Sequence, residues 1–292
     1  MASADDPNPF CVACRLNELI PDLSVPGNLE RWRKLEKAKR RIVYTIMHLG
    51  LPMEGVPEEK RPALRFNFAA DIAGGSPVLT GHADGLITVN IAEADDAERE
   101  SRRVNLREPY RTLLGHLRHE VAHYYWDRLI ANSEWLPRYR ELFGVETANY
   151  DAALKQHYQQ GAPPDWQARH VSAYASAHPW EDWAETWAHY FHIVDMVETA
   201  GSFGLKLKPI HPAAKTMTAD PAKAGDGNAS FDTVLANWFP LTHALNALNR
   251  GMGLLDVYPF VLSCGAIEKL RFVHEVVRTT SAEKEKLRAA KK

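Results

Sequence analysis

The sequence predicts an α+β protein that is mostly helical. Four long segments, residues 29–50, 109–130, 172–201 and 231–277, carry apolar residues at the three- and four-residue spacing of amphipathic helices. Short runs rich in β-branched and aromatic residues lie between residues 64 and 91, and turn-forming glycines separate them. We therefore expect a small sheet that precedes most of the helices.

The first 28 residues are rich in proline and are expected to form an N-terminal arm that contains Cys11 and Cys14. Residues 29–50 follow as a helix, with Trp32 and Leu35 among its inward side chains. Its outer face offers a surface for an acidic partner or nucleic acid, although such faces are usually solvated. The basic residues assigned to that face are Arg31, Arg33, Lys34, Lys37, Lys39, Arg40 and Arg41.

Residues 64–68, 77–80 and 86–91 are expected to be strands, with a turn at Ala83-Asp84-Gly85. The sheet comes directly before the helix at 109–130. If Leu86–Ile91 lies at a sheet edge, it can bind an extended peptide as an added strand, and an ordinary edge strand is the alternative.

The helix from Pro109 to Ile130 contains the sequence HEVAH at residues 119–123. Proline suits a first helical turn. Residues four apart lie on the same helical face, so His119 and His123 can bind one metal ion while Glu120 lies beside it. Two histidine ligands with a glutamate general base are the arrangement of zinc peptidases.

A third ligand is expected on the helix at 172–201, where Pro179 can begin the helix and Gly201 can end it. Tryptophans and other large residues form its buried stripe, and Glu181 and Glu185 flank that stripe one turn apart. Spacing alone leaves both glutamates open as the ligand. The weaker candidates for a site are His82, His170, His189 and His192.

The remaining segments are expected to support this centre. Residues 132–165 are too apolar for a loose loop and predict a helical insert, whereas residues 201–230 resemble a linker. Residues 231–277 predict a helical cap, in which Cys264 is expected to be a small buried side chain. Residues 281–292 are expected to form a charged tail that frays.

Composition excludes several classes of protein. The chain has 292 residues, a formal net charge of −2 and 3 cysteines. These values give no electrostatic footprint for nucleic acid and no disulfide framework. No apolar run is long enough to span a bilayer, and the N-terminus has no apolar signal core. We therefore expect a cytoplasmic protein that binds neither membranes nor nucleic acid.

Long stretches of the chain resemble a family of bacterial zinc-binding metallopeptidases. Besides HEVAH and SAYASAHPWEDWAETWAHY, the similar strings include CRLNELIPDLSVPGNLERWRKLEKAKRR, PVLTGHADGLITVNIAEADDAERE and NWFPLTHALNALNRGMGLLDVYPFVLS. The resemblance runs from about Cys11 to Arg278. It implies a zincin-like core at residues 29–280.

Members of the family usually carry a zinc ribbon ahead of this domain. Cys11 and Cys14 would be the second half of such a ribbon, so we expect no complete ribbon here.

A more distant resemblance suggests roles for individual residues. The segment EDWAE at 181–185 is similar to a segment of lethal-factor-like and Pro-Pro-endopeptidase metalloproteases. In those families the first glutamate binds zinc, and a tyrosine seven residues earlier supports the oxyanion. This resemblance implies that Glu181 is the ligand and Tyr174 the helper, with Glu185 orienting a ligand histidine.

The expected function is hydrolysis of peptide bonds with one Zn²⁺ held by His119, His123 and Glu181. Glu120 would be the general base, and Tyr174 or His178 would support the oxyanion. Asp127, one turn beyond His123, is either a group that orients a ligand or a surface ion-pair partner. The alternative function is an inactive zinc-binding adaptor that acts through the basic helix; an intact Glu120 argues against it. A chance motif on a helical interaction protein is a third interpretation.

Overall fold

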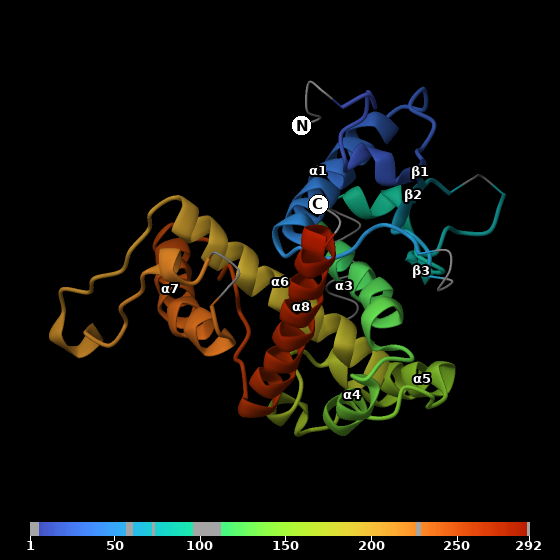
Figure 1. Cartoon of the computed structure of the whole chain (residues 1–292). Coiled ribbons are helices and arrows are strands. Elements are labelled where there is room, and N and C mark those ends of the chain that lie inside the picture. Colours follow the sequence, from blue (N-terminus) through green and yellow to red (C-terminus); the bar gives the residue numbers. More distant parts are fainter. Residues whose placement is uncertain (1–5, 57–60, 72–73, 96–111, 226–228, 291–292) are drawn as a thin grey trace.

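The computed structural model describes residues 6–56, 61–71, 74–95, 112–225 and 229–290. It is a mostly helical α+β protein, as the sequence predicts (Figure 1). The helices are α1 (Asn28–His48), α3 (Leu113–Tyr125), α4 (Leu136–Phe143), α5 (Tyr150–Gln160), α6 (Pro179–Ser202), α7 (Phe231–Gly251) and α8 (Cys264–Ala290). The strands are β1 (Asn17–Leu19), β2 (Arg65–Ala69), β3 (Gly81–Ala83) and β4 (Leu86–Asn90).

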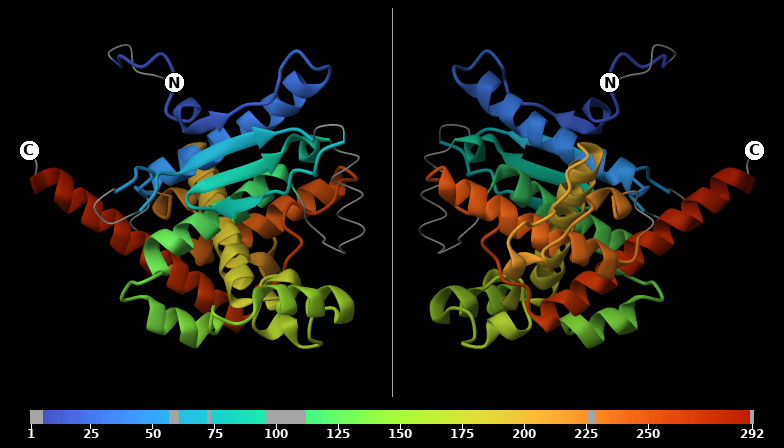
Figure 2. Two further views of the ribbon diagram at one scale, coloured as in Figure 1. Left: turned by 90° about the vertical axis from the view of Figure 1, so that its right-hand side faces the viewer. Right: turned by 90° about the vertical axis from the view of Figure 1, so that its left-hand side faces the viewer.

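The sheet lies on one side of the helices, with strand order β1-β2-β4-β3 (Figure 2). β2 pairs with β1 and β4 in parallel, and β3 pairs with β4 antiparallel. Alternate residues of β2 and β4, among them Phe66, Phe68 and Val89, point into the core. β1 belongs to the segment expected to be an arm, so part of residues 1–28 is built into the sheet.

The expectation that Leu86–Ile91 forms a sheet edge is wrong. β4 lies between β2 and β3, so both of its edges are paired. The edge strands are β1 and the short β3, and β3 begins after residues 77–80 rather than within them. The predicted turn is confirmed: Asp84 and Gly85 have φ angles of 48° and 78°, which match a two-residue hairpin turn.

Helix α3 carries the HEVAH sequence and begins after Thr112, whose hydroxyl accepts a hydrogen bond from the Gly115 amide at 2.9 Å. The proposed start at Pro109 lies outside the described residues. Beyond Tyr125 the chain continues as one π-helical segment, Trp126–Ile130, so the predicted helical stretch continues to Ile130 with a changed hydrogen-bond pattern.

Helix α6 has the predicted start, because Pro179 is its first residue and the His178 side chain caps it. Its tryptophan stripe fills the core: Trp183 and Trp187 are fully buried, and the Trp183 indole N–H donates to the Ala122 carbonyl at 2.9 Å. This packing brings the face of α6 that carries Glu181 against the histidine face of α3.

The C-terminal half forms the predicted helical cap, but it differs from the prediction in two details. The insert after α3 forms α4 and α5, and α7 and α8 cover α6 (Figure 1). Cys264 is exposed rather than buried, because it is the first residue of α8 and precedes the buried stripe that starts at Ala266. Helix α8 continues to Ala290, through most of the segment expected to fray.

The basic face of α1 is partly used inside the molecule. Lys39, assigned to the outer face, is fully buried and paired with Glu36 at 2.6 Å, which corrects that assignment. Helical spacing did not reveal this, because a buried ion pair interrupts the apolar stripe. Arg31 pairs with Asp95 at 2.9 Å. Arg33, Lys37 and Arg40 remain exposed.

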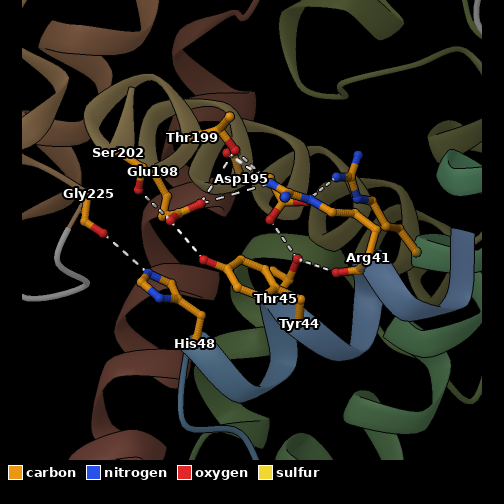
Figure 3. Close-up of polar contacts among 10 residues, drawn as sticks. Arg41, Tyr44, Thr45, His48, Asp195, Glu198, Thr199, Ser202 and Gly225 are labelled. Carbon is orange, nitrogen blue, oxygen red and sulfur yellow. Dashed lines mark hydrogen bonds and ion pairs between the residues drawn. The ribbon is translucent and has the colours of Figure 1, made fainter. Parts of the chain in front are cut away.

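A polar junction joins α1 to α6 (Figure 3). The buried Asp195 carboxylate accepts hydrogen bonds from Thr45 at 2.6 Å and from Arg41 at 3.2 Å. It also accepts one from Arg118 of α3 at 2.5 Å. Since Arg118 directly precedes His119, this junction fixes α3 against α6 where the histidines begin.

Within the described part of the chain, no helix combines the length and the apolar composition that a membrane span requires.

Candidate metal centre

His119, His123 and Glu181 come together where α3 packs against α6. All three side chains are buried, and one potential ligand atom of each lies within 4.8 Å of the others. The Nε2 atoms of His119 and His123 are 3.2 Å apart. The Glu181 carboxylate lies 3.0 Å from His119 Nε2 and 3.6 Å from His123 Nε2.

These distances fit one zinc ion. Ligand atoms on a tetrahedral zinc with bonds of about 2.0–2.1 Å lie about 3.3–3.4 Å from one another. Glu181 Oε2 is buried and forms no hydrogen bond among the described residues, although His119 Nε2 is near it. Two imidazole nitrogens and a buried carboxylate oxygen that accepts no hydrogen bond from the described residues therefore lie around one point, as an incomplete coordination shell would.

Glu185 occupies a different place from Glu181. Its Oε1 lies 2.8 Å from Nδ1 of His119, the ring nitrogen that points away from the shared point. Its Oε2 accepts a hydrogen bond from the Ser172 hydroxyl at 2.6 Å. A carboxylate on the far nitrogen of a metal-binding histidine fixes the tautomer and ring orientation. The geometry thus separates the two glutamates that spacing left open.

The tyrosines and His178 lie around this centre in different ways. Tyr174 lies just before α6, and its ring centroid is 6.0 Å from that of His119. His178 instead caps α6: its Nδ1 accepts from the Trp180 amide, and its Nε2 lies 3.2 Å from the Ala148 carbonyl. Both nitrogens of His178 are occupied, so Tyr174 is the better placed of the two donors considered.

The sequence interpretation missed Tyr150. This residue is the first of α5, and its hydroxyl donates to Glu181 Oε1 at 2.8 Å. The contact spans 31 positions of sequence, and the insert carries no motif that points to it. The sequence near Tyr150 offers one local feature, Asn149, which caps α5 and so marks where the helix begins.

The sequence interpretation also missed His116, which lies beside Glu120, and Glu93, which contacts His116. His116 Nε2 lies 3.2 Å from Glu120 Oε1, one turn earlier on α3. On its other side, His116 Nδ1 lies 2.5 Å from Glu93, which is in the short helix after β4. The four-residue spacing of His116 and Glu120 is visible in the sequence, whereas nothing local points to Glu93.

The weaker candidates lie outside this cluster. His170 contacts Asp182 at 3.1 Å, and His189 contacts the Tyr258 hydroxyl at 2.6 Å. His82 lies 3.7 Å from Asp127, and His192 lies 3.4 Å from Arg118. Asp127 therefore contacts a histidine of β3 rather than His123. Burial raises the pKa of the Asp127 carboxyl to about 6.

Without metal, the buried cluster holds a proton. Burial opposes protonation of His119, but the carboxylates of Glu181 and Glu185 outweigh it and raise its pKa well above the usual value. Burial lowers the pKa of His123 to about 4. Burial would raise the pKa of Glu181, but His119 and His123 lower it overall. These shifts favour a protonated His119 beside an ionised Glu181 and a neutral His123.

Zinc binding at pH 7 is expected to release about one proton, because His119 must lose its proton before Nε2 can bind a metal. Zinc affinity should then rise with pH by about tenfold per unit, up to the raised pKa of His119. Titration calorimetry in buffers of different ionisation enthalpy measures the proton count. Binding with no proton release, and with an affinity that does not change between pH 6 and pH 8, would contradict this protonation state.

The fold and the site define a mostly helical α+β protein with a candidate centre of two histidines and one glutamate. Comparison with known families is consistent with that class. A family model described as "Putative zinc-binding metallo-peptidase" matches residues 28–276. The chain belongs to this family.

Three similar proteins are mycobacterial. A protein of Mycobacterium bovis and one from each of two Mycobacterium tuberculosis strains are 43% identical over 278 residues, which cover 95% of this chain and 78% of theirs. All three carry the description "uncharacterized protein". No solved structure matches the chain.

Proposed function

We infer that the protein is a zinc-dependent peptidase that hydrolyses peptide bonds at the centre formed by α3 and α6. The observation that carries this inference is the convergence of His119, His123 and Glu181 next to a buried glutamate, Glu120. A helix pair that presents two histidines, a third carboxylate ligand and a separate base is the arrangement of metal-dependent peptide hydrolysis.

His119, His123 and Glu181 would hold one zinc ion. When bound there, zinc supplies Lewis acidity, which polarises a carbonyl and lowers the pKa of a coordinated water to about 7. Glu185, supported by Ser172, holds the His119 ring in the tautomer whose Nε2 is free to bind the metal.

Glu120 is the general base in this mechanism. Burial alone would raise its pKa, but His116, His119 and His123 lower it to about 2, so the carboxylate is ionised and able to accept a proton. It accepts the proton of the water that attacks the peptide carbonyl and passes it to the departing amine.

Tyr174 is the donor for the oxyanion. Burial raises the pKa of its phenol far above the usual value, so the hydroxyl keeps its proton and can donate it as a hydrogen bond. A peptide or a protein is the expected substrate.

The proposal predicts that zinc-loaded protein cleaves members of a broad peptide library and that 1,10-phenanthroline stops the cleavage. Mass spectrometry of the products measures both effects, and re-addition of zinc should restore activity. Cleavage that persists in the chelator would identify a contaminating protease. A protein that holds zinc and cleaves no peptide would instead belong to the regulatory, adaptor-like class.

A further inference from the structure

The base Glu120 is at one end of a chain of polar contacts that leaves α3 and reaches the sheet. His116 and Glu120 are four residues apart on the same helical face, and His116 Nε2 lies 3.2 Å from Glu120 Oε1. The Glu120 side chain is buried and that of His116 is about one-fifth exposed. One oxygen of the base is therefore held by a neighbour that is not a ligand residue.

The far side of His116 is fixed by Glu93. Its Oε2 lies 2.5 Å from His116 Nδ1, and its Oε1 accepts a hydrogen bond from the Thr80 hydroxyl at 2.6 Å. Thr80 in turn accepts from the amide of Asn90, the last residue of β4, at 3.1 Å. Glu93 is 4% exposed, so this support is inside the protein.

A ring between two carboxylates can hold both only if each ring nitrogen carries a proton. Burial disfavours the charged ring, but Glu93 and Glu120 outweigh it and raise the pKa of His116 to about 9. The doubly protonated ring donates a hydrogen bond to Glu93 and forms an ion pair with Glu120, and charge-assisted contacts of this kind are stronger than neutral ones.

We propose that His116 and Glu93 are positioning residues, which hold the Glu120 carboxylate in place as the proton acceptor of the reaction. The proposal rests on the proposed peptidase function. The contacts carry it: α3 alone would leave the Glu120 side chain free to rotate about its own bonds, whereas the link to Thr80 and β4 ties it to a second element. Neither residue contacts the shared point of the three candidate ligands.

The test compares His116→Phe with His116→Gln in zinc-loaded protein, with His48→Phe as the control. Phenylalanine removes the donor to Glu120, whereas the glutamine amide keeps one N–H. His48 serves as the control because it is exposed and lies on α1, a different helix from the one that carries His116. With a library-derived peptide, His116→Phe is expected to lower kcat by about 10–100-fold with unchanged KM, and His116→Gln to recover part of that loss.

Zinc content and folding are measured alongside. The expected result is the wild-type zinc content in every variant. Zinc loss in His116→Phe that parallels the loss of activity would overturn the positioning role, and so would an unchanged kcat. If His116→Phe does not fold, Glu93→Gln replaces it, with an expected loss of kcat in the same direction because the neutral amide holds the ring less firmly.

A second readout separates this proposal from the peptidase function. Acetohydroxamate is a small zinc-binding compound with N–H and O–H groups, so it would report both on zinc held by the three candidate ligands and on the Glu120 carboxylate, which can accept a hydrogen bond. If wild-type protein with zinc cleaves nothing, the peptidase proposal fails, and the acetohydroxamate dissociation constant still tests the positioning. Acetohydroxamate binding that is weaker by a similar factor in Glu120→Gln and His116→Phe supports the positioning role. Unchanged binding in His116→Phe overturns it.

Discussion

Glu120→Gln is expected to remove most of the hydrolytic activity while the zinc stays bound. Glutamine matches glutamate in size but does not accept a proton at neutral pH, so the base is lost and the shape of the site is kept. General base catalysis contributes about 10²–10⁴-fold, and kcat should fall by a factor in that range. Steady-state kinetics on the library-derived peptide, together with elemental analysis of zinc, measures both effects.

Glu141→Gln is the matched control, because this glutamate is exposed on α4 and takes no part in the cluster. It should retain wild-type kcat and zinc. A Glu120→Gln protein that keeps the wild-type rate would remove Glu120 from the mechanism. A variant that loses zinc as well as activity would show that Glu120 supports the metal site rather than the proton transfer.

Lys269→Met is expected to be the most destabilising of the single substitutions considered. Lys269 Nζ lies 2.5 Å from the carboxylate of Asp182, which is fully buried between α6 and α8. Removing Lys269 leaves the buried carboxylate with His170, at 3.1 Å, in place of a lysine ammonium, and breaking a buried ion pair costs about 3–5 kcal/mol. Urea unfolding of metal-free protein measures the free energy of unfolding without a contribution from zinc.

The exposed pair of Lys206 and Asp220 provides the control. These groups are 3.0 Å apart, but the lysine side chain is 53% exposed, so Lys206→Met should cost no more than about 1 kcal/mol. The double variant Lys269→Met with Asp182→Leu should recover much of the loss, because no charge then remains buried. Equal effects of Lys206→Met and Lys269→Met would contradict the importance of the buried pair.

The helices that form the centre could be predicted because their signals are local. The spacing of His119 and His123 follows from one turn of helix, and Pro179 and the tryptophan stripe mark α6 without any knowledge of packing. The choice between Glu181 and Glu185 could not be made from spacing. Both glutamates lie near one face a turn apart, and only the docking of α3 decides which of them meets Nε2.

The missed features depend on contacts between distant segments. Glu93 reaches His116 across 23 positions, and Tyr150 reaches Glu181 across 31. The sequence suggests that β4 is an edge strand because β3, which pairs with it, is only three residues long. Lys39 reads as exposed because a pattern of charges does not reveal which lysine has a buried partner. Each of these errors concerns which segments meet rather than which segments form.

Zinc content of purified wild-type protein, His119→Ala, Glu181→Ala and Glu185→Gln tests the metal centre most directly. We expect about one zinc per wild-type chain, none in the two alanine variants, and retention in Glu185→Gln with an affinity about 10–100-fold weaker. Zinc retained in Glu181→Ala but lost in Glu185→Gln would contradict the assignment of the third ligand. A wild-type protein that binds no zinc after zinc is added back would contradict the centre itself.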